Sequence, residues 1–82
     1  MQISNKECVV YVVYGKKGCP LCVKSVAMIE RFEKIYSYID IEEDGQALGF
    51  LVKQGFKSLP QIYYNDKHIG GYNDLQKHIL TI

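Results

Sequence analysis

The sequence has no tryptophan, only two prolines and no apolar run near the roughly 18 residues that a membrane-spanning helix needs. Neither sign of charge dominates, because ten Lys and Arg residues face nine Asp and Glu residues and leave a net charge of +1. Proteins that bind the phosphate backbone of nucleic acid usually carry a clear basic excess. We therefore expect neither a nucleic-acid partner nor a membrane partner.

The first seven residues also lack the apolar stretch of a secretory signal. Cysteine is scarce, and its three copies are an odd number, which is a poor framework for structural disulfides. Both features favour a reducing compartment, and we expect the cytoplasm. Cys19 and Cys22 form a CxxC pair, whereas Cys8 stands apart, so the pair is either redox-active or half of a metal site.

The chain does have enough apolar material for one small core. Of its 82 residues, 48% are hydrophobic and 23% are charged, which is typical of a globular protein. A chain this short has no room for a second core. We therefore predict one domain over residues 1–82.

Apolar periodicity predicts an α/β domain in the order strand, helix, strand, helix, strand, strand, helix. The first helix lies between two strands, which makes those strands parallel with a right-handed crossover. Asn65 and Asp66 predict the tight turn of a hairpin, and Asn73 or Asp74 is expected to cap the last helix. The expected strands are residues 8–14, 36–41, 61–64 and 67–69, and the helices run from Pro20 to about Lys34, from the 42–45 turn to near Gly55, and through Leu75, Ile79 and Leu80.

The first strand and the first helix predict where the two paired cysteines lie. The strand over 8–14 is an almost continuous β-branched and aromatic run, so we expect it to be central and buried on both faces. In the helix, the apolar face carries Cys22, Val26 and Ile29, and Phe32 extends it. In the second helix the apolar positions are Ala47, Leu48, Leu51 and Val52. Cys22 should therefore point to the core, with Cys19 at the mouth of its helix.

This position suits sulfur chemistry. A thiol with an ordinary pKa of about 8.5 is only about 3% ionised at pH 7, and the thiolate is the nucleophile. Unpaired backbone N–H groups at a helix N-terminus, together with Lys16 or Lys17 nearby, would lower the pKa of Cys19. We expect Cys19 to attack a disulfide and Cys22 to resolve the mixed disulfide that results.

Half of a zinc site is the alternative for the CxxC pair. The further ligands would be Cys8, His68 or His78, but the sequence has no second CxxC and no close His pair. A CxxC beside a strand–helix–strand unit favours redox chemistry instead. We therefore expect no metal, and we expect Cys8 to be a small buried residue.

Three segments together resemble the glutaredoxins. Residues 14–22 (YGKKGCPLC) are similar to the active-site segment of that family, residues 58–64 (SLPQIYY) to its TVPQIF-type segment, and residues 67–75 (KHIGGYNDL) to its GGxxDL segment. The segments come in the family's order and spacing, and the likeness is greatest to the short dithiol type of bacteria and phages. The resemblance implies a thioredoxin fold: a four-stranded mixed sheet in the order second, first, third, fourth strand, flanked by three helices. It also implies a cis peptide bond before Pro60.

The resemblance implies glutathione as the co-substrate. In this family pattern Lys16 meets the glycine carboxylate, the backbone of Leu59 pairs with the cysteine residue, and the helix start at Asn73 and Asp74 receives the γ-glutamyl end. Each role has a simpler alternative, in which Lys16 is merely solvated, Asp74 only caps a helix and the glycine pair only closes a hairpin. The expected glutathione-binding residues are Lys16, Leu21, Ser58, Leu59, Pro60, Gly71, Asn73 and Asp74.

Two departures and two rivals accompany the resemblance. Leu21 stands where many dithiol members have tyrosine, and Ser58 replaces the usual threonine. The implied partners are disulfide-containing or glutathionylated proteins, with ribonucleotide reductase as one candidate, and the protein would be a monomer. One rival is a related redoxin reduced by thioredoxin reductase, against which Lys16 and residues 70–74 (GGYND) speak. Thioredoxin itself is disfavoured because its site is normally WCGPC and this chain has no tryptophan. The other is a dimer that binds a [2Fe–2S] cluster through Cys19 and glutathione.

Overall fold

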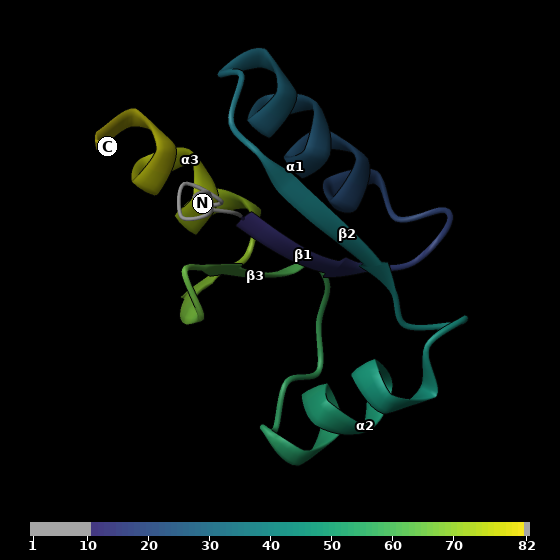
Figure 1. The fold of residues 1–82 in the computed structure, drawn as a ribbon. Helices are drawn as coiled ribbons and strands as arrows, with labels where there is room; N and C mark the ends of the chain where they lie inside the picture. The colour runs from purple at the N-terminus through teal and green to yellow at the C-terminus, as the bar shows by residue number, and fades with distance from the viewer. Residues whose placement is uncertain (1–10, 82) are drawn as a thin grey trace, which may run out of the picture.

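The computed structural model describes residues 11–81, which form a four-stranded mixed sheet with three helices (Figure 1). The strand order is β2-β1-β3-β4, with β1 parallel to β2 and antiparallel to β3. The predicted element order, the parallel crossover and the thioredoxin fold are confirmed. The elements are β1 (Tyr11–Gly15), α1 (Pro20–Arg31), β2 (Tyr36–Asp40), α2 (Gly45–Lys53), β3 (Gln61–Tyr64), β4 (Lys67–Gly70) and α3 (Tyr72–Thr81).

Strand β1 lies in the middle of the sheet, as predicted, but it is not buried on both faces. Its burial alternates, with Tyr11, Val13 and Gly15 buried and the residues between them half-buried. Helices α1 and α3 cover one face of the sheet and α2 lies across the other (Figure 1). A single short helix covers its face incompletely, which explains the alternation. Gly15, expected to end the strand, belongs to it, and residues 8–10 with Cys8 lie outside the described residues.

The core lies between the sheet and the pair α1 and α3. Its buried members are Tyr11, Val13, Ile29, Ile62, Leu75 and Ile79. On the opposite face, α2 packs through a triangle of aromatic rings: Tyr14 and Tyr63 from the sheet and Phe50 from the helix, with centroids 5.7 to 5.9 Å apart. The sheet therefore receives helices on both faces but has its aliphatic core on one.

Several expected apolar positions are exposed instead. The buried residues of α1 are Cys22, Ser25 and Ile29. The polar Ser25 can be buried because its hydroxyl donates a hydrogen bond to the carbonyl of Leu21 in the same helix, at 2.7 Å. Val26 is half-buried and Phe32 lies at the edge, 36% exposed. The short helices α2 and α3 bury only two residues each, and three of the apolar positions expected in them are exposed: Leu48, Val52 and Leu80.

Helix α1 ends at Arg31, three residues earlier than the expected Lys34. The chain turns at Glu33, whose φ of 58° is left-handed. The amide of Glu33 donates to the carbonyl of Glu30 at 3.0 Å, and that of Lys34 donates to the carbonyl of Ile29 at 3.1 Å. These are the two bonds of a Schellman motif, which usually has glycine at the left-handed position. The sequence offers no glycine there, and so the end of the helix was predicted too late.

The hairpin is confirmed. Asn65 and Asp66 have φ values of 52° and 67°, and a two-residue turn with both φ values positive is type I′. It joins β3 to β4 with a bulge between Ile62 and Tyr63. None of the helices within residues 11–81 has the length and apolar character needed to cross a bilayer.

Candidate active site

The paired cysteines lie at the N-terminus of α1 and are joined by a disulfide, with their Cα atoms 5.2 Å apart. Cys19 is the N-cap of the helix and Pro20 its first residue. The Sγ of Cys19 accepts the backbone N–H of Cys22 at 3.2 Å. Cys19 is half-buried, whereas Cys22 is 1% exposed and faces the core. The predicted orientation of the pair, one sulfur at the helix mouth and one inside, is confirmed.

The lysines beside the pair point elsewhere or stay in solvent. Lys17 pairs with Glu43, whose Oε2 lies 3.3 Å from its Nζ, and both side chains are largely exposed. Lys16 is exposed, and its backbone carbonyl accepts the hydroxyl of Tyr38 at 3.2 Å. The contact that the structure provides to the Cys19 sulfur is thus a backbone N–H. A lowered pKa of Cys19 stays a prediction.

Strand pairing brings the second segment to the same edge of the sheet. Tyr14 pairs with Gln61 across β1 and β3, so the chain beyond Gly15 and the chain before Gln61 leave the sheet at one end. The peptide bond between Leu59 and Pro60 is cis, as the resemblance implied. Ser58 is exposed, Leu59 half-buried and Pro60 buried.

A chain of hydrogen bonds anchors the segment before Pro60. The side-chain amide of Gln61, 7% exposed, donates to the carbonyl of Ser58 at 2.8 Å and lies 3.4 Å from the hydroxyl of Ser58. Its Oε1 lies 2.7 Å from the Nε2 of His68 on β4. The role of Gln61 and His68 in this segment was not predicted from the sequence. A polar residue at the start of an otherwise apolar strand was the available signal, because a buried amide needs partners.

In the third segment, residues 67–75, the N-cap of α3 differs from the one expected from the sequence. The helix begins at Tyr72, so Asn73 and Asp74 lie in its first turn and neither is the N-cap. The carbonyl of Gly71 accepts the N–H of Leu75 at 2.9 Å, which makes Gly71 the N-cap. Asp74 reaches back to the N–H of Gly71 at 3.1 Å, the return bond of a capping box. An acidic residue at the third helical position imitates a cap in sequence.

The two glycines of this segment have different surroundings. Gly70 has a φ of 122°, and a Cβ there would collide with the carboxyl group of Asp74. A Cβ on Gly71 would lie 3.5 Å from the carbonyl oxygen of Pro60. Gly71 therefore places the start of α3 beside the cis-proline, and the predicted site residues Pro60, Gly71 and Asp74 come together.

Metal ligands do not cluster in the part of the chain that is described. Among residues 11–81 there is no group of three or more His, Cys, Asp or Glu side chains that could hold a metal ion. Two of the candidate zinc ligands have other partners: the Nε2 of His68 lies 2.7 Å from the Oε1 of Gln61, and the Nδ1 of His78 lies 2.7 Å from the hydroxyl of Tyr11. The third candidate, Cys8, lies outside the described residues.

Residues 11–69 match the Glutaredoxin family. The chain belongs to the glutaredoxin family. Glutaredoxin 1 of Salmonella typhimurium is 36% identical over 73 residues, which cover 79% of this chain and 84% of that protein. Glutaredoxin 1 of Escherichia coli is 34% identical over 71 residues, covering 77% and 84%.

Solved glutaredoxins have the same fold. The NMR structure of oxidised Escherichia coli glutaredoxin aligns with a TM-score of 0.73 at 30% identity, covering 88% of this chain and 94% of that one. A buckwheat glutaredoxin solved in complex with glutathione aligns with a TM-score of 0.70 at 27% identity, covering 83% of this chain and 66% of the buckwheat chain. A glutaredoxin with the Cys19–Cys22 pair is a thiol–disulfide oxidoreductase, which agrees with the redox role expected for the CxxC pair.

Proposed function

We propose that this glutaredoxin uses glutathione to reduce protein disulfides and mixed disulfides of glutathione. The observation that carries the proposal is the placement of the Cys19 sulfur, which caps α1 and accepts the N–H of Cys22. A donor aimed at this atom stabilises a thiolate more than a thiol and so favours the nucleophile. The buckwheat relative, solved as a glutathione complex, supports the choice of co-substrate.

In the proposed reaction the Cys19 thiolate attacks one sulfur of a client disulfide. The Cys19–client bond forms as the client's own S–S bond breaks, and the leaving sulfur takes a proton from solvent. Cys22 then loses its proton to solvent and attacks Cys19, which releases the second client sulfur and oxidises the pair to the disulfide. One glutathione thiolate opens that disulfide at Cys19, and a second removes the first as glutathione disulfide.

The proposed glutathione groove runs between the CxxC and the first turn of α3. Lys16 would pair with the glycine carboxylate, the backbone of Leu59 next to the cis bond would pair with the cysteine residue, and the N-terminus of α3 would receive the γ-glutamyl carboxylate. Asp74 would neutralise the ammonium group, although one of its oxygens already accepts from Gly71. The full proposed set is Lys16, Leu21, Ser58, Leu59, Pro60, Gly71, Asn73 and Asp74.

The wider setting follows from the same proposal. Its clients would be glutathionylated or disulfide-containing proteins of a reducing compartment such as the cytoplasm, and ribonucleotide reductase would be one of them. The functional unit would be a monomer with one domain over residues 1–82. Leu21, 43% exposed beside the disulfide, offers clients an aliphatic contact at the helix mouth.

Reduction of the mixed disulfide of glutathione and hydroxyethanethiol tests the proposal. With glutathione and glutathione reductase, Cys22→Ser should retain much of this activity, because deglutathionylation needs only Cys19, but it should lose the reduction of a client protein disulfide, which needs both thiols. Cys19→Ser should lose both activities. Turnover with thioredoxin reductase in place of glutathione would favour the redoxin alternative, and a brown dimer after anaerobic purification would favour the [2Fe–2S] alternative.

A further inference from the structure

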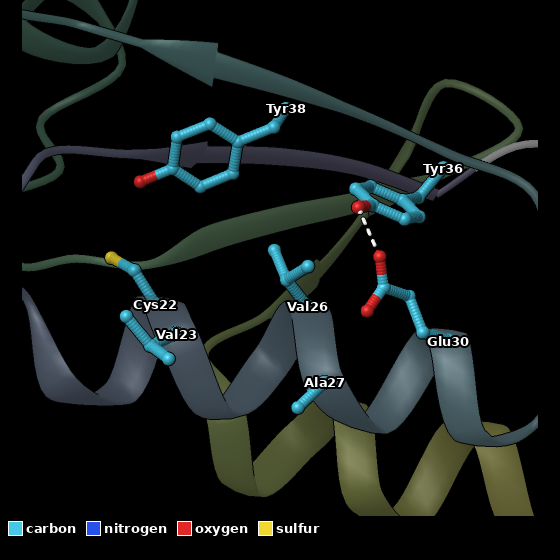
Figure 2. A pocket seen from close by; sticks show the side chains of 7 residues that line it. All are labelled: Cys22, Val23, Val26, Ala27, Glu30, Tyr36 and Tyr38. Carbon is cyan, nitrogen blue, oxygen red and sulfur yellow. Dashed lines mark hydrogen bonds between the residues drawn. The ribbon is translucent and has the colours of Figure 1, made fainter.

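A surface groove of about 460 Å³ separates α1 from the edge strand β2 and ends at the inner cysteine. Figure 2 shows two tyrosines of β2 that point toward α1. Tyr36 lies at one end of the groove, and Tyr38 lies at the other end, near Cys22. The hydroxyl of Tyr36 donates to Glu30 at 2.7 Å and is fully engaged there. The groove is lined by Cys22, Val23, Val26, Ala27, Glu30, Tyr36 and Tyr38.

Gly15 shows how near the Tyr38 hydroxyl lies to the Cys22 sulfur. A Cβ built on Gly15 would lie 2.5 Å from the hydroxyl oxygen of Tyr38 and 2.7 Å from the Sγ of Cys22. The two atoms thus flank one point that only a glycine leaves empty. In the disulfide form the hydroxyl donates to the carbonyl of Lys16 at 3.2 Å.

Reduction changes what the Cys22 sulfur requires. A disulfide sulfur carries no charge, whereas the resolving step needs a thiolate, and a thiolate at 1% exposure has little access to water. An unpaired buried charge is costly unless a donor reaches it. Burial, and next the charge of Asp40, raises the pKa of the Tyr38 hydroxyl, so it keeps its proton and remains a donor.

We propose that the hydroxyl of Tyr38 is a catalytic hydrogen-bond donor to Cys22 in the resolving step. On reduction it turns from the Lys16 carbonyl to the sulfur and stabilises the thiolate that attacks Cys19. The electron pair of that thiolate forms the Cys19–Cys22 bond, and the released client sulfur takes a proton from solvent. The charged and titratable groups around this hydroxyl are Lys16, Lys17, Asp40, Glu43 and Asp44 on its solvent side, with Glu30 and Tyr36 along the groove.

The inference rests on the proposed role of Cys22 as the resolving thiol, and two readouts separate the two claims. In the Cys19→Ser protein, Tyr38→Phe should raise the pKa of Cys22, measured as the pH dependence of its alkylation. In the dithiol protein, Tyr38→Phe should slow release of a client from its mixed disulfide with Cys19 by about tenfold or more in a single-turnover experiment, the effect of losing one hydrogen bond to a charged group.

Tyr36→Phe is the matched control, because it removes a hydroxyl from the same groove without touching Cys22, and it should leave both readouts at the parent values. If Tyr38→Phe lowers the stability of the fold, the Cβ chemical shift of Cys22 followed against pH still reports folded molecules alone. Equal Cys22 pKa values in the Tyr38→Phe and Tyr36→Phe proteins would overturn the inference. If Tyr38→Phe raises the pKa of Cys22 as expected but the parent protein does not reduce disulfides with glutathione, the proposed function is overturned and the inference about Tyr38 stands.

Discussion

The buried amide of Gln61 connects the segment before the cis-proline to strand β4. The carbonyl of Ser58 can only accept, so the amide nitrogen of Gln61 must face it and the amide oxygen must face His68. His68 therefore carries a proton on Nε2. The ring of His68 also stacks on Phe56, with centroids 4.4 Å apart, which fixes its orientation. The direction of every bond in this chain follows from one acceptor.

Gln61→Leu should loosen that segment more than it weakens the fold. Ser58 and His68 are exposed and can exchange their lost partner for water, so the free energy of unfolding should fall by only about 1 kcal/mol or less. The KM for a glutathione mixed disulfide should rise several-fold with a smaller change in kcat, because the backbone at Leu59 is less well placed. Steady-state kinetics and urea unfolding measure the two effects. Gln54→Leu, at an exposed glutamine, is the control, and an unchanged KM for the Gln61 variant would contradict the role of the chain.

At the scale of elements, α1 and α2 end with the same pair of hydrogen bonds but different residues. Gly55, with a φ of 84°, donates to Val52, and Phe56 donates to Leu51, each at 3.0 Å. In α1 the left-handed position is Glu33, where a side chain is less favourable. Glycine made the end of α2 predictable from sequence, and its absence hid the end of α1.

Exchange at these two positions should change stability in opposite directions. Glu33→Gly should stabilise the protein by up to about 1 kcal/mol, because it relieves a left-handed side chain. Gly55→Ala should destabilise it by about 1 to 2 kcal/mol, because it introduces one. The midpoints of urea unfolding measure both changes. Loss of stability in Glu33→Gly would show that the Glu33 side chain contributes more than its backbone costs.

At the scale of the whole molecule, α3 and the central strand are joined by the Tyr11 hydroxyl and the ring of His78. Burial, and next the nearby Tyr64, raises the pKa of Tyr11 to about 12. Burial, and next Lys67, lowers the pKa of His78. Both shifts favour the neutral pair, in which the hydroxyl donates to the unprotonated nitrogen. The contribution of His78 is therefore complete above its unfolded pKa and is lost as the pH falls.

Tyr11 should limit stability in alkali. Its pKa is higher in the folded state, so its contribution is complete below the unfolded value near 10 and is lost as the pH rises through about 12. The loss should be on the order of 3 kcal/mol in the free energy of unfolding, from about two pKa units. Urea unfolding between these pH values should show a steeper decline in the parent protein than in Tyr11→Phe. Parallel declines would contradict this assignment, since the other tyrosines are common to both proteins.

Local patterns in the sequence predicted the order of the elements, the parallel pairing of the first two strands and the placement of the cysteines, whereas the order of the strands in the sheet came from the resemblance to the glutaredoxins. Apolar runs, the turn at Asn65 and Asp66 and the proline after Cys19 each signal an element by themselves. The contacts of Gln61 with His68 and the approach of Tyr38 to Cys22 depend on strands that meet only in the folded sheet. Asp74 was misread as a cap because the return bond of a capping box and a true N-cap use the same residue type.

Because the Cys19 sulfur both caps the N-terminus of α1 and reacts, each turnover changes the hydrogen bond at the start of this helix. A thiolate holds the Cys22 amide proton by a charge-assisted bond, while a disulfide sulfur holds it only weakly. The strength of the hydrogen bond from the Cys22 amide therefore depends on the oxidation state of the protein.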